Sequence, residues 1–519
     1  MKSKIIQLIL SVFLISQIAY SQEWPKIYGD NFHALVNDMN ETYDQGIILS
    51  GFIYLPYGFC RYIWIIKTDI NGDLLWWKKI GDSSHQYGLT RSEITTDNGL
   101  IFSGGTTKYT GDFDPLFVKM NTCGEVEWCR VLSSPGYNLA LEIINLPDNT
   151  YMGLLQYYGE GDTYARSNLI KLDQIGEPVW IQKLAQEDST IINEELYNLL
   201  YSSDSNIIIS GDRGPGQFAY WIKTDTAGNQ IWDLKWQGGY GGARQVIETS
   251  NQMFYSAGGF AGPGYHMTPS IFKFDNSGTK IYQEYLLGDT LAGGGAEPMI
   301  LYGDTSLITG IQWRTSNDVE DGYSDILKTD TLGNIINRRT LIHYNKCPKA
   351  IMQSSDNKVL VTGNYMPSNY WDIYLWKFNT NLEDDTLYTQ PLTYDSLCPF
   401  EIQSDTMDLD CDLFVNIDEL PTREEYESTV KIYPNPARDW VALTLPDVVA
   451  EGKVEIAVYD VFGREVETGR GGDKEMEGQG EVPVNRMLVL DVSGYPPGMY
   501  VVVVTDRKGR RYTGKVIVR

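Results

Sequence analysis

The chain has 519 residues, 42% of them hydrophobic, which is enough for several ordinary globular domains or for one large repeat domain with additions. Its formal net charge of −26 argues against nucleic acids and anionic membrane surfaces as partners. The 35 tyrosines and 13 tryptophans suit half-buried sheet surfaces and binding faces.

The N-terminus has the features of a secretory signal peptide. Two lysines precede an apolar run over residues 5–19, and the sequence AYS has the small residues of a signal-peptidase site. We expect cleavage between Ser21 and Gln22, which would remove residues 1–21; the alternative is an uncleaved N-terminal anchor. No other apolar run has the length needed to cross a membrane, so we expect no transmembrane segment in the mature chain.

The region that follows contains seven copies of one unit. Each copy has a strand-like segment with one lysine, then a short turn, and then a strand-like segment that carries tryptophan in the best-preserved copies. The repeated lysines lie 49 to 55 residues apart and are Lys67, Lys119, Lys171, Lys223, Lys273, Lys328 and Lys377. Two further strand-like segments precede each lysine, and four strands per unit are typical of a propeller blade. The sequence therefore predicts an all-β fold with a seven-bladed β-propeller over residues 22–397.

Two segments of the chain could complete the last blade of this ring. One is the N-terminal segment around Trp24, which has no blade before it, and the other is the segment 385–388. We favour the N-terminal segment.

A turn motif recurs in the units, as in KTDINGDLLW at residues 67–76, where aspartate can cap its own turn and glycine accepts a positive φ. This pattern resembles the docking motif of quinoprotein-type propellers. The resemblance implies that tryptophan packs between blades and that the turn fixes its position, although Tyr282 and Asn337 replace tryptophan in later units. It implies blade geometry only. The chain lacks the adjacent cysteine pair that quinone enzymes carry over their cofactor, so we expect no cofactor.

The second loop of each unit is long and differs from unit to unit, whereas the first and third turns are short. Variable loops on a rigid ring are where function usually lies. Each second loop contains aromatic residues, and the candidate binding face consists of Tyr57, Tyr109, Tyr158, Tyr220, Tyr265, Trp313 and Tyr370. Such side chains suit a glycan or a protein surface. The alternative is that they only pack loop against loop.

No catalytic residue is assigned, because the sequence shows no catalytic motif. His33 and His85 lie at equivalent positions of neighbouring units, which indicates a scaffold role, and the other two histidines stand alone. Acids in the second loops could form a glycosidase pair; they are Asp112, Asp114, Glu160, Asp162 and Asp321. No metal site is expected, because the chain has no paired cysteine motif or histidine cluster and the calcium-like turn at 69–73 recurs as a plain hairpin turn.

A boundary separates the repeats from the last part of the chain. From Ser428 to the C-terminus, 13 basic and 13 acidic residues cancel, so the whole charge excess belongs to the region before it. We interpret residues 398–430 as an acidic linker. Six cysteines allow 15 disulfide pairings. We favour a bond between Cys398 and Cys411, because both lie in the short segment after the repeats.

Residues 431–519 alternate between apolar and polar residues in short strands, as in a small immunoglobulin-like β-sandwich. Four motifs follow in order: YPNPARD, VYDVFGREV, LDVSGYPPGMYVVVV and a terminal GKVIVR. They resemble the type A sorting domain carried by cargo of the type IX secretion system. The residues that carry this resemblance are Tyr433, Pro434, Asn435, Pro436, Gly463, Gly498 and Tyr500.

The resemblance implies the route and the partners of the protein. It implies passage through the periplasm, export by the type IX machinery, and removal of the domain by a surface sortase, with attachment to the outer surface or release. We therefore expect a secreted or surface-attached propeller that binds a glycan or a protein without catalysis. The alternatives are a carbohydrate-active enzyme that uses loop carboxylates and a structural or adhesion protein.

Overall fold

The computed structural model divides the chain into two compact units, Met1–Glu419 and Leu420–Arg519. It describes residues 23–29, 32–54, 61–133, 135–158, 165–184, 193–214, 217–236, 238–261, 266–287, 293–314, 322–341, 348–367, 369–390, 392–415, 420, 429–445, 454–460, 464–471, 487–505 and 511–519. The named elements in these ranges are all β-strands. Within them, no helix is long and apolar enough to cross a membrane.

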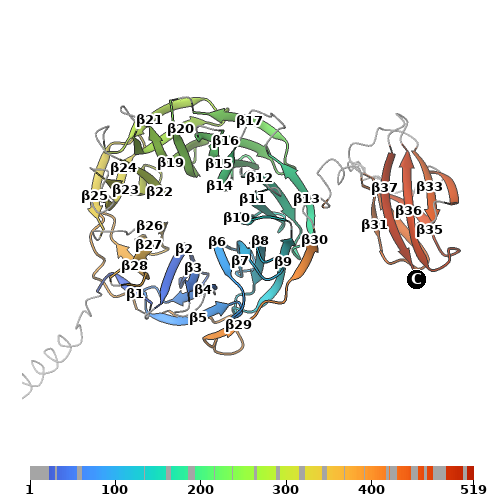
Figure 1. Ribbon diagram of the computed structural model, residues 1–519, viewed down its shortest axis with the longest axis horizontal. Helices are drawn as coiled ribbons and strands as arrows, with labels where there is room; N and C mark the ends of the chain where they lie inside the picture. Colours follow the sequence, from blue (N-terminus) through green and yellow to red (C-terminus); the bar gives the residue numbers. More distant parts are fainter. Residues whose placement is uncertain are drawn as a thin grey trace, which may run out of the picture. The chain divides into compact units, whose positions relative to one another are not determined.

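In the described part of the first unit, seven antiparallel sheets stand around a common centre (Figure 1). Sheet 1 contains β2 (His33–Glu41), β3 (Ile47–Tyr54), β4 (Arg61–Thr68) and β5 (Leu74–Ile80); sheet 2 contains β6 (Tyr87–Ile94), β7 (Leu100–Thr106), β8 (Asp114–Met120) and β9 (Val126–Ser133); sheet 3 contains β10 (Leu139–Asn145), β11 (Tyr151–Tyr157), β12 (Arg166–Leu172) and β13 (Pro178–Lys183). Sheet 4 contains β14 (Glu194–Tyr201), β15 (Asn206–Arg213), β16 (Phe218–Asp225) and β17 (Gln230–Lys235); sheet 5 contains β18 (Gly241–Glu248), β19 (Met253–Ala261), β20 (Met267–Asp275) and β21 (Lys280–Tyr285); sheet 6 contains β22 (Gly293–Tyr302), β23 (Ser306–Arg314), β24 (Gly322–Asp330) and β25 (Ile335–Thr340). Sheet 7 contains β26 (Pro348–Gln353), β27 (Val359–Tyr365), β28 (Asp372–Phe378) and β1 (Lys26–Tyr28).

The sheets pack face to face with their first strands innermost. Each first strand contacts the first strand of the next sheet, and β26 of sheet 7 contacts β2 of sheet 1, so the series returns to its start. Every position of β7 and β8 is buried, whereas the outer strand β17 alternates between exposed and half-buried positions. Strands covered on both faces tolerate continuous apolar runs, which explains these patterns. The fold is all-β and propeller-like.

The N-terminal strand completes sheet 7. Strand β1 pairs antiparallel with β28, with Lys26 opposite Leu375 and Tyr28 opposite Ile373. This confirms the favoured closing strand. Beside the competing segment 385–388, Asp384 forms an isolated bridge with Phe378.

Residues 392–415, here called the belt, run back along the outside of sheets 1 and 2. Strand β29 (Asp405–Met407) pairs parallel with the outer edge of β5, and β30 (Asp412–Val415) pairs parallel with the outer edge of β9. The first part of the segment that the sequence predicts as a linker therefore adds a fifth strand to each of two sheets. Figure 1 shows β29 and β30 at the rim of the ring.

The predicted bond between Cys398 and Cys411 is wrong. Cys398 is bonded to Cys123, 275 residues earlier, and Cys411 is bonded to Cys129, 282 residues earlier. The belt causes this pairing, because it places both of its cysteines against sheet 2. The remaining cysteines, Cys60 and Cys347, lie outside the described residues.

The repeated turn has the predicted geometry. Asp69 Oδ1 accepts the backbone N–H groups of Asn71 and Asp73 at 2.9 and 2.7 Å, and Gly72 has a φ of +79°. A Cβ atom at Gly72 would lie 3.0 Å from the ring of Trp24, so this glycine admits the tryptophan of the preceding sheet. The other six sheets repeat the double acceptance at Asn121, Asp173, Asp225, Asp275, Asp330 and Asn379.

The second unit contains two sheets around its own apolar core. One sheet contains β31 (Lys431–Tyr433), β32 (Trp440–Thr444) and β35 (Met487–Asp491); the other contains β34 (Glu465–Gly471), β33 (Val454–Asp460), β36 (Gly498–Thr505) and β37 (Arg511–Val518). The motif that begins at Tyr433 is tied to the last strand, since Asn435 Oδ1 accepts the N–H of Ile517 at 2.9 Å and its Nδ2 donates to the carbonyl of Lys515 at 2.9 Å. Tyr500 is buried and donates its hydroxyl to the carbonyl of Pro496 at 2.7 Å.

Both Pro434 and Pro436 are preceded by cis peptide bonds. Gly498 begins β36, and Gly463 lies outside the described residues, as do Ser21 and Gln22 of the predicted cleavage site.

Candidate functional site

The structure describes five of the seven residues of the predicted aromatic face, and each of the five has neighbours of its own. Tyr220 is only 2% exposed and donates its hydroxyl to Asp233 Oδ2 at 2.9 Å, while Tyr109 donates to the carbonyl of Cys411 in the belt at 3.3 Å. The other described members lie against separate neighbours: Trp313 against Tyr323, Tyr370 against His33, and Tyr158 against Tyr137. No ring contact joins any two of these five described residues. Tyr57 and Tyr265 lie outside the described ranges.

Two of the five loop acids, Asp112 and Asp114, lie within the described residues. Asp114 is fully buried and accepts a hydrogen bond from the hydroxyl of Thr110 at 2.9 Å, whereas Asp112 is exposed. Glu160, Asp162 and Asp321 lie outside the described residues.

The innermost strands bring polar side chains to the centre of the ring. Each of these seven strands has a bulge at the same place, and polar residues follow it in five of them, namely Asp38, Arg91, Glu142, Asn198 and Gln245. Three of them accept a backbone N–H from the next sheet: Asp38 from Ser92 at 2.8 Å, Asn198 from Val246 at 3.0 Å, and Gln245 from Met299 at 2.7 Å. These contacts fasten neighbouring sheets to one another.

Arg91 crosses the centre of the ring. Its Nη2 donates to Glu297 Oε1 at 2.9 Å, which joins sheet 2 to sheet 6, and its Nη1 donates to the carbonyl of Asn37 at 2.9 Å. Glu142 Oε2 lies 3.8 Å from Arg91 Nε, yet burial raises the pKa of Glu142 to about 8 despite the attraction of the arginine. An acid of this kind beside an arginine can hold a proton near neutral pH.

A second polar group lies on sheets 4 and 5. The hydroxyl of Tyr197 donates to Glu195 Oε2 at 2.7 Å, and the Arg244 guanidinium lies 4.2 Å from the centre of the Tyr197 ring. Burial raises the pKa of Asp212 to about 7, although Arg244 and the Tyr197 hydroxyl act in the opposite direction. Within the described residues, no cluster of histidine, cysteine, aspartate or glutamate is placed to hold a metal ion.

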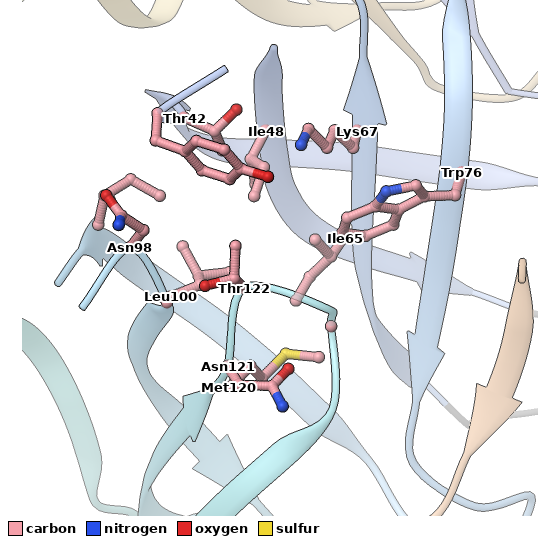
Figure 2. Close-up of a pocket in the computed structure, with 14 residues that line it drawn as sticks. Thr42, Ile48, Ile65, Lys67, Trp76, Asn98, Leu100, Met120, Asn121 and Thr122 are labelled. Atoms are coloured by element: carbon pink, nitrogen blue, oxygen red, sulfur yellow. The ribbon is translucent and has the colours of Figure 1, made fainter. Parts of the chain in front are cut away.

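A small cavity lies between sheets 1 and 2, where Ile65, Lys67 and Trp76 face Leu100 and Met120 (Figure 2). Its volume of about 20 Å³ has room for one water molecule. The belt covers it, because Asp395 accepts hydrogen bonds from Lys67 Nζ at 2.6 Å and from Trp76 Nε1 at 3.1 Å. This cavity is therefore a packing gap and not a ligand site.

A much larger cavity, here called the closure pocket, lies where β1 meets the outer part of sheet 1. It has a volume of about 490 Å³. Apolar and aromatic side chains form most of its lining, with Lys26, Asp73 and Lys79 as the charged members; the rest of the lining includes Ile27, Tyr28, Phe32, Ile53, Trp64, Ile66, Leu74 and Trp77. This volume is within the usual range of small-molecule sites, about 300–1,000 Å³.

Lys79 is the distinctive residue of the closure pocket. Its Nζ lies 4.9 Å from the centre of the Trp77 ring and 5.6 Å from that of Phe32, and burial lowers the pKa of this lysine. No carboxylate pairs with Lys79 among the described residues, whereas Lys26 pairs with Asp73 at 3.0 Å. The indole Nε1 of Trp64 is buried without a hydrogen-bond partner in the described structure. The pocket therefore offers aromatic faces and one cation that has no counter-ion among the described residues.

Comparison with known proteins identifies the C-terminal unit. Residues 431–519 match the family described as the secretion system C-terminal sorting domain. No curated protein matches the chain.

Among solved structures, the chain is similar to an ulvan lyase from a new family of polysaccharide lyases, PL25, with a TM-score of 0.46 and 11% identity over 69% of this chain and 95% of that one. It is also similar to the α-L-arabinanase of Penicillium chrysogenum, with a TM-score of 0.39 and 8% identity over 68% and 98%. A protein of unknown function from Dyadobacter fermentans gives a TM-score of 0.39 and 11% identity over 68% and 97%. At these scores the similarities assign neither an activity nor a ligand to the chain. The sorting domain itself shows that the protein is exported through the type IX secretion system to the cell surface or the medium.

Proposed function

We propose that the mature protein is an exported seven-bladed β-propeller that binds an acidic glycan in the closure pocket without catalysis. The presence of Lys79, a half-buried cation between aromatic rings and without a counter-ion in the described residues, carries this proposal. Removal of residues 1–21 as a signal peptide, and release of the immunoglobulin-like C-terminal domain by a surface sortase, belong to the same proposal. They are supported by the sequence at the N-terminus and by the sorting-domain match.

The architecture supports seven blades. Seven sheets in the described residues, each with four repeat strands, contact one another in sequence and return to the first, and β1 supplies the outer strand of the last sheet. Closure of the ring by an N-terminal strand joins the two ends of the repeat region, so that the last sheet does not end in an unpaired strand at the point where the ring closes.

The chemistry of the closure pocket suits a sugar that carries a carboxylate or sulfate. Trp64, Trp77 and Phe32 provide flat apolar surfaces on which a sugar ring can lie. The Lys79 ammonium can pair with an anionic substituent of such a sugar. A protein strand fits less well here, because the edge of β5 from Lys78 to Ile80 is already paired with the belt.

The same lining favours binding over bond cleavage. Asp73 is the sole acid among the described residues that line the pocket, and it is engaged with Lys26. Glycoside hydrolysis ordinarily requires two carboxyl groups about 5–10 Å apart across the bond.

The proposal is tested by calorimetric titration of the full mature protein with oligogalacturonate, a sulfated oligosaccharide and a neutral gluco-oligosaccharide of equal length. We expect binding of an acidic oligosaccharide, and about tenfold weaker binding after Lys79→Met, as for the loss of one charged contact. Lys183→Met is the matched control, because Lys183 holds the same repeat position in sheet 3 outside the pocket.

Failure of every acidic oligosaccharide to bind, or equal weakening by the two lysine variants, would contradict the proposal. Appearance of shortened oligosaccharides in the titration mixture would instead show that the protein is a carbohydrate-active enzyme.

A further inference from the structure

The belt shows what the groove between the outer strands of two neighbouring sheets can hold. Between sheets 1 and 2, Leu409 is only 1% exposed and packs in one apolar cluster with Ile80 and Val131. On either side of it, Asp405 pairs with Lys78 at 2.8 Å and Asp412 pairs with Arg130 at 2.6 Å. An extended segment with alternating acidic and apolar residues thus fills this groove in the chain itself.

The equivalent groove between sheets 4 and 5, here called the open groove, lies along β17 and β21. Trp232 and Tyr282 hold the repeat positions of Trp76 and Trp128, so Trp236 and Tyr285 hold those of Ile80 and Val131. In the open groove these positions border a cavity of about 430 Å³, which is lined by Leu234, Lys235, Trp236, Gly238, Phe272, Lys280, Gln283 and Tyr285.

Two cations of the open groove lack acidic partners in the described structure. Lys235 Nζ lies 4.3 Å from the centre of the Phe218 ring, and Lys280 Nζ lies 5.2 Å from that of Phe272. Both lysines are exposed and neither forms an ion pair with a described carboxylate, in a chain whose net charge is −26. Ile231 and Ile281 are about half exposed on the same strands, at 51% and 47%.

The strand edges beside this groove are also free to pair. In sheets 1 and 2 the outer strands β5 and β9 pair with belt strands, whereas β17 and β21 are terminal strands of their sheets within the described residues. An open edge presents backbone N–H and C=O groups to an added strand.

We propose that the open groove binds an extended segment of a partner protein in which acidic and apolar residues alternate. An apolar side chain of the partner enters the cavity beside Trp236 and Tyr285, as Leu409 does between sheets 1 and 2. Carboxylates of the partner pair with Lys235 and Lys280, and its backbone adds to the edge of β17. This site is separate from the closure pocket and does not depend on glycan binding.

A peptide with the sequence of residues 404–414, in which Cys411 is replaced by serine, is a direct probe. Its fluorescence anisotropy is followed during titration with the full mature protein. We expect saturable binding that the double variant Lys235→Met/Lys280→Met weakens at least tenfold, and that a peptide with its four aspartates changed to asparagine does not reproduce.

Lys79→Met, which changes a lysine of the closure pocket, is the matched control and should leave peptide binding unchanged. The lysines of the open groove are exposed, so the double variant is expected to fold, and its melting temperature verifies this.

Two outcomes overturn the proposal. One is peptide binding that is absent or equal in the wild type and the double variant. The other is a concentration-dependent dimer that the double variant abolishes while the peptide fails to bind, which would identify a second copy of this chain as the occupant.

Discussion

At the residue scale, the lysine that recurs in the units forms an ion pair within its own sheet, a role that its spacing in the sequence does not reveal. Lys67 Nζ lies 2.7 Å from Asp44, and both side chains are 2% exposed. Lys119, Lys171, Lys223 and Lys377 pair in the same way with an aspartate of the first turn of their sheets. The sequence held a signal for this pairing, because Thr or Ser precedes the aspartate by two positions in four units, as Thr42 precedes Asp44.

Because the burial of these pairs differs from sheet to sheet, we expect the same lysine substitution to change the free energy of unfolding by different amounts at equivalent positions. Lys67→Met leaves the buried Asp44 carboxylate without its cation and is expected to lower the free energy of unfolding by about 3–5 kcal/mol. Lys171→Met should lower it by less than about 1 kcal/mol, because Asp148 is 59% exposed and lies 3.6 Å away. Urea denaturation of the two variants measures both values, and similar losses would show that burial of the pair does not govern its strength.

At the element scale, strands were predictable and the belt was not. Strands such as β8, with the buried sequence DPLFVKM, follow from apolar content and turn signals. The belt sequence SDTMDLDCDLF is rich in acids, so the sequence predicts that it belongs to an acidic linker. Three of those charges are balanced by Lys78, Lys108 and Arg130, which come from distant parts of the chain that a linear pattern does not place beside the belt.

The disulfides make the belt a test of element-scale stability. The bond between Cys129 and Cys411 reduces the entropy of the unfolded chain, and loss of such a bond typically costs about 2–4 kcal/mol. We expect the double variant Cys129→Ser/Cys411→Ser to unfold at lower urea concentration and to be cut within the belt faster by a protease than the wild type. Retention of both properties would show that this bond is dispensable and that strand pairing together with the Cys123–Cys398 bond is enough to hold β29 and β30.

At the scale of the whole molecule, the spacing of the repeats predicted the series of four-stranded sheets and its closing strand. The candidate site could not be predicted from the sequence, because the closure pocket combines Tyr28 of the last sheet with Trp64 and Lys79 of the first. These residues meet only when the ring closes, and none of them lies in the variable second loops. Tyr220, which does lie near such a loop, is buried.

Ring closure by β1 leads to a prediction for the entire first unit. Removal of residues 22–29 leaves β28 with an unpaired edge and removes one wall of the closure pocket. We expect a lower melting temperature for the propeller and loss of any ligand-induced stabilisation at the closure pocket, both measured by calorimetry. A truncation of residues 22 and 23 alone is the control, and equal melting temperatures for the two truncations would mean that β1 is dispensable.

The disulfide between Cys129 and Cys411 also determines which sheet of the ring carries a mechanical load. A pull applied to the chain beyond Cys411 passes through its sulfur to Cys129 and enters the ring at sheet 2. The 281 residues between these cysteines are bypassed, so the force does not peel sheet 7 or any sheet before it from the C-terminal side. If the exported protein is held at the cell surface from its C-terminal side, the tension therefore acts on sheet 2. Sheets 4 and 5, which form the open groove, then carry none of it.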